Sequence, residues 1–449
     1  MLNWVLPVHG YLDTLPIRKP VTNDGEVYVP GLDNLSRTAT SSAAQRALDQ
    51  GEGVLRLAPT WVPRSFCVPG RRIKLDPRDY FALGGARGGI DERWLSSATR
   101  ADNGPLTGPD EGLSFVVAPD QEKVPFDELV GHLGAALVGQ RLWDCHSGWP
   151  MYSKFFDNLG ALPLHVHHTD EKAALVGRTG KPEAYYFPPQ MNNHLGTMPV
   201  SYFGLTPGTT REELRHRLAR FVSDGDNQIT ELSLGYRVKL GTGWDMPAGV
   251  LHAPASLCTY EPQAASDVFA MCENWTSCRT LPPELLWKDV PGEHHGDLDF
   301  IISLLDWEKN TDPNFFSARF MAPMGEGDAT LENAGYVQHW VVYRASGFSA
   351  KELTVGPGAS VVITDSAAYG AIAVQGRGSL GVWNVETPTL IRYGELTHDE
   401  FFVCESAAQT GVVIKNSSDT EPLVLLKHFG PGNPDLPSAA SADQVAVQP

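Results

Sequence analysis

Residues 164–187 read LHVHHTDEKAALVGRTGKPEAYYF, and this stretch decides how the rest of the chain is interpreted. His165 and His167 are two positions apart, so in a β-strand both imidazoles point to one face while His168 points to the other. Paired imidazoles bind zinc, iron, nickel or manganese, usually together with a carboxylate that compensates the charge. The stretch therefore predicts a metal site carried on a strand.

The composition of the 449-residue chain indicates a globular protein of two or three domains. Its 44 glycines and 34 prolines favour a β-rich architecture with many turns. The net charge of -18 argues against nucleic acid or an anionic membrane surface as the main partner. The six scattered cysteines form no CxxC pair, and neither a signal peptide nor a run of the ~20 apolar residues of a membrane span is present. We expect a cytoplasmic monomer or homodimer with reduced thiols.

Strand-like runs separated by turn formers occupy residues 155–274 and resume from residue 347. Helical spacing predicts a helix over residues 126–139, and a capping box of Thr210 and Glu213 predicts a second. We expect five parts: an N-terminal extension that can add strands (1–73), a metal-binding domain with a helical insertion (74–290), a connecting segment (291–346), a metal-free β domain (347–432) and a disordered tail (433–449).

A second motif, DMPAGVLHA at residues 245–253, places His252 after a Pro-x-Gly turn. An HxH pair, a glutamate and then this turn with its histidine resemble the general cupin pattern, in which neighbouring strands bring the ligands into the mouth of a barrel. That pattern places the glutamate at Glu171. Glu183 is the alternative, because an extended run would return it beside the histidines. The residues alone leave this choice open.

Further motifs resemble type I mannose-6-phosphate isomerases over about residues 80–290. HVHHTDEKA followed by GKPEAYYF is similar to the QVHPDDE and GKTE pair of that family. Five more segments resemble it in the same order: GGIDERWLSS, PFDELVGHLGAALVG, REELRHRLARF, MPAGVLHA and TYEPQAASDVFAMCENW. The resemblance implies a mainly β fold of two cupin domains (double-stranded β-helix or jelly-roll) with a few inserted helices.

The resemblance also assigns the ligands of one divalent metal ion, namely His165, His167, Glu183 and His252. The family has a glutamine where His165 stands, so this chain carries three histidines and one glutamate, a set that redox cupins also use. Zinc is the first expectation, with manganese, iron, cobalt or nickel as alternatives. Glu171 matches a family acid that is not a ligand, so the resemblance selects Glu183.

Three more residues are implied in catalysis. Lys181 matches the lysine of the GK-x-E motif and would act as a charge clamp or proton carrier. Glu261 matches an E-x-Q glutamate that could act as general base, and Arg279 would stabilise the negative charge of a developing enediolate. Pro163 replaces a small hydroxyl residue of the family's phosphate site and His168 replaces a proline, and both departures argue against mannose 6-phosphate itself as the substrate.

The implied function is a metal-dependent aldose–ketose isomerase that converts a sugar or sugar phosphate through a cis-enediol. One alternative is a cupin dioxygenase or related redox enzyme that uses the three-histidine, one-glutamate site. Another is a carbohydrate-binding cupin without turnover. An isomerase should work without oxygen, and a pure binder should change its melting temperature with a sugar yet release no product.

Overall fold

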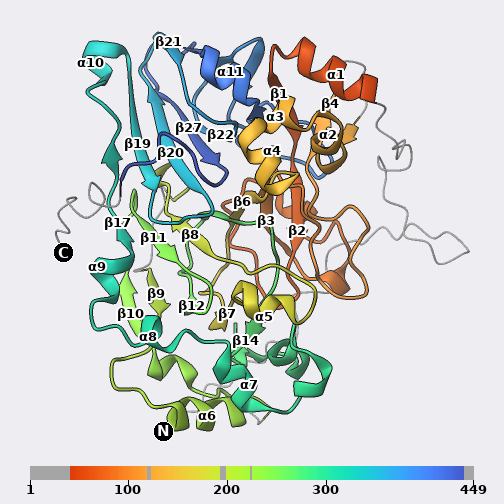
Figure 1. The fold of residues 1–449 in the computed structure, drawn as a ribbon, viewed down its shortest axis with the longest axis vertical. Helices are drawn as coiled ribbons and strands as arrows, with labels where there is room; N and C mark the ends of the chain where they lie inside the picture. Colours follow the sequence, from red (N-terminus) through yellow and green to blue (C-terminus); the bar gives the residue numbers. More distant parts are fainter. Residues whose placement is uncertain (1–40, 119–122, 193–198, 223–224, 439–449) are drawn as a thin grey trace, which may run out of the picture. The chain divides into compact units, whose positions relative to one another are not determined.

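The computed structural model describes residues 41–118, 123–192, 199–222 and 225–438. All of them belong to the second of the two units into which the chain divides, Thr38–Pro449. Antiparallel strands dominate and form four larger sheets and one hairpin (Figure 1). The prediction of a mainly β, cupin-like fold is confirmed. Within the described ranges, no helix is both long enough and apolar enough to cross a membrane.

Two sheets build the half of the structure that contains the motif histidines. The seven-stranded sheet has the order β17 (Phe320–Met321), β11 (Gly243–Met246), β8 (Glu183–Tyr186), β13 (Thr259–Ala264), β6 (Met151–Phe156), β3 (Ile90–Leu95), β2 (Thr60–Pro63). The five-stranded sheet has the order β10 (Leu234–Arg237), β9 (Val200–Phe203), β12 (Leu251–Ala253), β7 (His165–Val166), β14 (Ala270–Met271).

Two further sheets build the other half. The nine-stranded sheet has the order β18 (Met324–Gly325), β19 (Tyr336–Val342), β20 (Ser349–Val355), β27 (Leu423–Phe429), β22 (Tyr369–Gln375), β25 (Glu400–Val403), β1 (Val54–Ala58), β4 (Phe115–Val117), β5 (Lys123–Pro125). The four-stranded sheet has the order β21 (Ser360–Ile363), β26 (Val412–Asn416), β23 (Arg377–Leu380), β24 (Trp383–Glu386). The hairpin pairs β15 (Trp275–Thr276) with β16 (Arg279–Thr280).

The helices are short and connect strands. They are α1 (Ser41–Gln50), α2 (Phe126–Leu133), α3 (Ala135–Val138), α4 (Gln140–His146), α5 (Asp170–Ala174), α6 (Arg211–Ala219), α7 (Leu298–Ser303), α8 (Trp307–Asn310), α9 (Phe315–Arg319), α10 (Leu331–Ala334) and α11 (Glu405–Thr410). The predicted helix over residues 126–139 is present as α2 and α3, which break at Gly134 because its φ is 50°. The second predicted helix is α6, and both hydrogen bonds of the Thr210–Glu213 capping box are formed.

The alternation of side chains along β8 shows how the sheets stack. Tyr185 packs with Phe203 in the core between the seven-stranded and five-stranded sheets. Tyr186 points the other way, into a core that it shares with Leu426 of the nine-stranded sheet, and its hydroxyl donates a hydrogen bond to Glu352 at 2.8 Å. Because successive residues of a strand face opposite sides, the seven-stranded sheet is covered on both faces.

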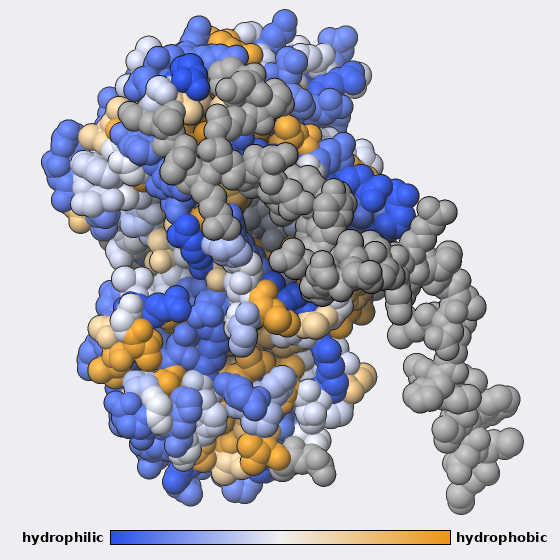
Figure 2. Space-filling model, turned by 90° about the vertical axis from the view of Figure 1, so that its right-hand side faces the viewer, coloured by the Kyte–Doolittle hydropathy of each residue, from blue (hydrophilic) through white to orange (hydrophobic). Residues whose placement is uncertain are grey.

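The nine-stranded and four-stranded sheets enclose a core of their own. Leu353 and Leu425 of the larger sheet pack there with Val361 and Ile414 of the smaller one. Side chains that do not enter a core are mostly polar. On the face drawn in Figure 2, hydrophilic residues predominate and the hydrophobic ones lie in small groups.

Parts of the chain expected to flank the two domains also supply strands. In the described portion of the expected N-terminal extension, β1 pairs with β25 of the nine-stranded sheet and β2 pairs with β3 of the seven-stranded sheet. The expected connecting segment contributes β17, β18 and β19. Asp435 accepts hydrogen bonds from the backbone and hydroxyl of Ser366, so the disorder expected from residue 433 does not extend to residues 433–438. Residues 1–40 and 439–449 lie outside the described part.

A buried ion cluster joins the two large sheets. The guanidinium of Arg93 on β3 donates two hydrogen bonds of 2.8 Å to Asp399 and one of 3.2 Å to Glu400 at the start of β25. All three side chains are buried. Two carboxylates therefore depend on one cation for compensation in a water-poor environment.

Arg93→Met should lower the free energy of unfolding by about 3–5 kcal/mol, because it leaves Asp399 and Glu400 buried without their cation. Urea unfolding followed by circular dichroism measures this change. Arg178→Met is the matched control, since Arg178 pairs with Asp102 where both side chains are partly exposed, and such pairs contribute about 0–1 kcal/mol. Equal effects of the two substitutions would contradict the proposed importance of burial.

Glu400 predicts a pH dependence of stability. Burial raises the pKa of Glu400 from 4.5 to about 7, against the opposing charge of Arg93. A carboxyl with a higher pKa in the folded state stabilises the fold fully below its unfolded pKa, and this contribution is lost as the pH rises through the folded pKa. The free energy of unfolding should therefore fall between pH 4.5 and 7, and fall less in Glu400→Gln, which mimics the neutral acid. Identical pH profiles of the two proteins would disprove this role.

Candidate functional site

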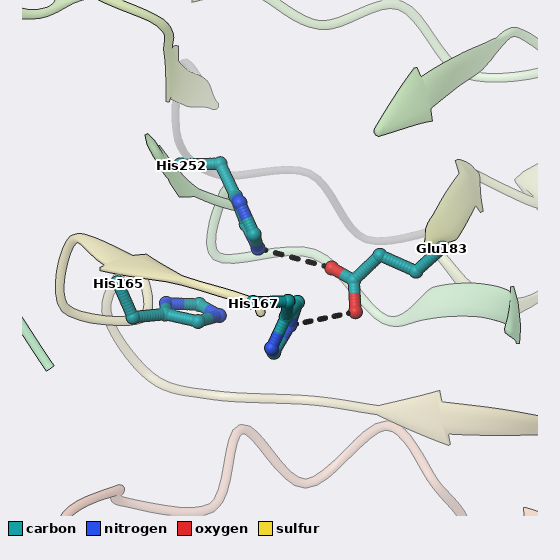
Figure 3. Close-up of side chains that lie close together, drawn as sticks. All are labelled: His165, His167, Glu183 and His252. Carbon is teal, nitrogen blue, oxygen red and sulfur yellow. Dashed lines mark ion pairs between the residues drawn. The ribbon is translucent and has the colours of Figure 1, made fainter. Parts of the chain in front are cut away.

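Four buried side chains from three strands meet in the half formed by the seven-stranded and five-stranded sheets. His165 lies on β7, His167 directly follows it, His252 lies on β12 and Glu183 begins β8. Each residue offers one ligand atom, and these atoms all lie within 4.8 Å of one another. Figure 3 shows the three imidazoles and the carboxylate turned toward a common centre. The pairing of His252 with His165 across β12 and β7 brings the second motif to the first.

Backbone carbonyls orient the three imidazoles. The Nδ1 atoms of His165, His167 and His252 each lie 2.7 Å from a carbonyl oxygen, those of Pro163, Val268 and Val250 respectively. A carbonyl only accepts, so each Nδ1 carries the proton and each Nε2 presents its lone pair. This tautomer is the one that can bind a metal ion through Nε2, and such carbonyl contacts are the usual way in which proteins hold a metal-binding histidine.

The carboxylate of Glu183 faces these lone pairs. Its two oxygens lie 2.9 Å from Nε2 of His167 and 3.1 Å from Nε2 of His252. Burial lowers the pKa of His165 and, as the largest cause, lowers that of His167 to about 3, so neutral imidazoles are favoured. Oxygen and nitrogen lone pairs then point at one another at hydrogen-bond distance. A divalent cation among them would convert repulsion into attraction, and three nitrogens with one carboxylate oxygen suit such an ion.

The structure separates the two candidate glutamates. Glu183 is 1% exposed and belongs to the cluster, and the hydroxyl of Tyr185 donates a hydrogen bond to it. Glu171 is exposed on α5 and does not belong to the cluster. His168 is buried but also lies outside the cluster, as the alternation of HVHH predicts.

Lys181 lies against the cluster. Its ammonium group is 3.1 Å from Nε2 of His167 and 3.1 Å from Glu183, and 3.8 Å from Glu261. Burial, followed by the negative charge of Glu183, raises the pKa of Glu261, while Lys154 and Lys181 oppose this shift. The two residues predicted from the sequence, Lys181 and Glu261, are thus brought beside the cluster.

Charged residues that were not identified from the sequence continue the series of ion pairs beyond Lys181 and Glu261. Lys154 is 3.3 Å from Glu261 and 3.1 Å from Glu92, and Arg64 lies 3.1 Å from Glu92 and 2.9 Å from Asp267. All of these side chains are buried. Their signal in the sequence is a charged residue inside an apolar strand, as in MYSKFF, where a lysine is surrounded by residues of the core.

Arg279 is the predicted site residue that the structure does not bring to the cluster. It is exposed on β16, and its guanidinium donates a hydrogen bond to the carbonyl of Ser65 at 3.1 Å. The β15–β16 hairpin carries Arg279 to the surface. Lys154 and Lys181 are instead the cations beside Glu261.

Comparison with known proteins gives likeness in structure alone. No protein-family model and no curated protein sequence matches the chain. Mannose 6-phosphate isomerase from Bacillus subtilis superposes with a TM-score of 0.54 at 16% identity, covering 84% of this chain and 99% of the other. A variant of phosphomannose isomerase from Salmonella typhimurium gives 0.57 at 11%, covering 84% and 100%. A mannose 6-phosphate isomerase bound with zinc and yttrium gives 0.56 at 11%, also covering 84% and 100%. The chain therefore has the fold of the mannose-6-phosphate isomerases.

Proposed function

We propose that this protein is a metal-dependent aldose–ketose isomerase that acts on a sugar or a sugar phosphate. The observation that carries the proposal is the buried cluster of three histidines and Glu183, with Lys181 and Glu261 directly beside it. The movement of a proton between two neighbouring sugar carbons requires a metal site with an acid–base pair next to it. The similar structures are mannose 6-phosphate isomerases, and one of them contains zinc, which supports this chemistry.

The proposed ligands are His165, His167, Glu183 and His252, with zinc as the first candidate metal. A divalent ion held there would act as a Lewis acid that polarises the sugar carbonyl and makes the neighbouring C–H group more acidic. The three carbonyl contacts at Nδ1 keep the imidazole lone pairs aimed inward. Burial of the cluster strengthens every charge interaction within it.

Glu261 is the proposed base. Removal of the proton from C2 would give an enediolate, whose C1 oxygen gains a proton while the C2 hydroxyl loses one. Return of the carbon-bound proton to C1 then completes the isomerisation. A cis-enediol presents both carbons to the same side, so one carboxylate can serve both steps. Because its pKa is raised, Glu261 binds a proton more strongly than an ordinary carboxylate. Lys154 and Lys181 flank this carboxylate and would stabilise negative charge on the substrate oxygens.

The charges near the cluster favour a substrate without a phosphate group. The cations there, Lys181, Lys154 and Arg64, already form ion pairs with Glu183, Glu261, Glu92 and Asp267. A phosphate would have to compete with these carboxylates for them. Pro163, in place of a hydroxyl residue, points in the same direction. We therefore propose a free aldose as the preferred substrate.

A redox function is the second candidate, because a three-histidine, one-glutamate set also suits iron or manganese in oxygen chemistry. Oxygen dependence separates the two functions. An isomerase needs no cosubstrate, whereas a dioxygenase consumes oxygen and yields an oxidised or cleaved product.

The purified protein should contain about one divalent metal ion per chain. Glu183→Gln should weaken metal binding by at least ~10–100-fold, the range caused by loss of even an indirect partner of a metal ligand. Glu171→Gln is the matched control and should retain the metal, since Glu171 is exposed on α5. Metal analysis by mass spectrometry after dialysis gives the readout. Equal loss in both variants, or loss in Glu171→Gln alone, would disprove the proposed ligand set.

Anaerobic incubation with aldoses in deuterated water should place deuterium at C1 or C2 of a product ketose, as NMR can detect. Glu261→Gln should slow this exchange by ~10²–10⁴-fold, the usual contribution of a positioned base, while Glu171→Gln should leave it unchanged. A requirement for oxygen would replace the isomerase proposal with the redox one. A preference for phosphorylated aldoses would overturn only the choice of a free sugar.

A further inference from the structure

A second cavity lies between the two halves of the structure and shares no residue with the metal cluster. Its volume is about 1040 Å³. One half contributes the segment 71–80 and η3 (Pro189–Met191). Because η3 follows the end of β8 and Glu183 begins it, the cavity and the metal cluster lie at opposite ends of this strand. The other half contributes residues 374–377, 386–390 and 418–421. The cavity is thus built by five segments from both halves of the structure.

The lining of this cavity carries four cations and two carboxylates, Glu386 and Glu421, so it is locally positive although the chain as a whole carries -18. Arg71, Lys74 and Arg377 line it, and none of the three forms an ion pair within the described residues. A fourth lining cation, Arg72, is engaged by Asp157 at 2.6 Å. An excess of cations over carboxylates, three of the cations without an ion-pair partner in the described part, favours an anion as the ligand.

The backbone of Lys74 is hydrogen-bonded to that of Ile391. Its carbonyl accepts a hydrogen bond of 2.8 Å from the backbone of Ile391, and the backbone of Asp76 in turn donates to Ile391. Its φ of 67° is unusual for a residue with a side chain. Burial lowers the pKa of Lys74 to about 8, with Asp399 opposing and Arg93 adding to the shift. A bound anion would compensate this partly buried charge, which lacks an ion-pair partner in the described structure.

Three residues that line the cavity also carry buried polar atoms without a hydrogen-bond partner in the described part of the chain. These atoms are the hydroxyls of Tyr80 and Thr387 and the side-chain oxygen of Gln190. The side chain of Tyr80 is only 6% exposed. Buried polar groups normally find partners, and hydroxyls that both donate and accept suit the hydroxyls of a sugar. These groups therefore point to a ligand that is polar beyond its charge.

We propose that this cavity binds a small phosphate ester that carries hydroxyl groups, of about the size of a hexose phosphate. Lys74, Arg71 and Arg377 would bind the phosphate, while Tyr80, Thr387 and Gln190 would bind the hydroxyl-bearing part. The volume suits such a ligand, since small-molecule sites commonly measure ~300–1,000 Å³. The proposal does not depend on the isomerase function, because no residue of the catalytic site takes part.

Hydrogen-exchange mass spectrometry on the full-length protein tests the site. Glucose 6-phosphate should protect amides in residues 71–80 and 386–392, and unphosphorylated glucose should not. Lys74→Met should weaken the affinity for glucose 6-phosphate by about tenfold or more, as expected for loss of a charged hydrogen bond. Arg78→Ser is the matched control, because Arg78 belongs to the same segment but is exposed and paired with Asp76. It should change the affinity less than about twofold.

Arg377→Ser provides a second variant at an exposed side chain, which keeps the test valid if Lys74→Met does not fold. Weaker binding in Arg377→Ser together with protection of residues 71–80 supports the site. Protection confined to residues 165–183 would assign the ligand to the catalytic cluster and overturn the proposal. Equal affinity for inorganic phosphate and glucose 6-phosphate would overturn the ester, and unchanged affinity in both folded variants would overturn the site itself.

Discussion

The buried carboxylate of Glu183 is the group on which the arrangement of the candidate site depends. It is 1% exposed, and Nε2 atoms of two histidines lie within 3.1 Å of its oxygens. An ionised carboxylate removed from water must be paired, because its lost hydration otherwise costs several kcal/mol. Lys181 supplies one positive charge. Because the lone pairs of the imidazoles face inward, a metal ion is the expected source of a second positive charge. Compensation of the Glu183 carboxylate therefore explains both the lysine and the histidines.

The seven-stranded sheet connects this site to the rest of the structure. On β8, Glu183 and Tyr185 face the five-stranded sheet, and Tyr186 faces the nine-stranded sheet. Neighbouring strands place charged side chains beside the cluster, since Lys154 on β6 is the direct cross-strand partner of Glu261 on β13. Packing on the opposite face holds these strands in place. The positions of Lys154, Glu183 and Glu261 are therefore set by a core that contains none of them.

The two halves of the structure compensate buried charge in different ways. The half formed by the nine-stranded and four-stranded sheets places Lys351 and Lys427 on either side of Asp365, with bonds of 2.9 and 2.7 Å. These ammonium groups satisfy the carboxylate and present no lone pair to a metal. Over the described ranges, the only cluster of three or more metal-type ligands is the one containing His165. Similar β architecture thus supports a candidate metal centre in one half and a closed ion cluster in the other.

The sequence by itself determined features that depend on local spacing. The alternation in HVHH, the turn before His252 and the capping box of α6 all concern residues within a few positions of one another, where strand and helix periodicity apply directly. Local spacing left the choice between Glu171 and Glu183 open; the family resemblance selected Glu183, and the tertiary structure places it in the cluster. Tertiary structure alone brought Lys154 to Glu261 and placed Arg279 on the surface. These outcomes depend on which strands become neighbours and in what register, and registers between segments about a hundred residues apart are set by the packing of whole sheets.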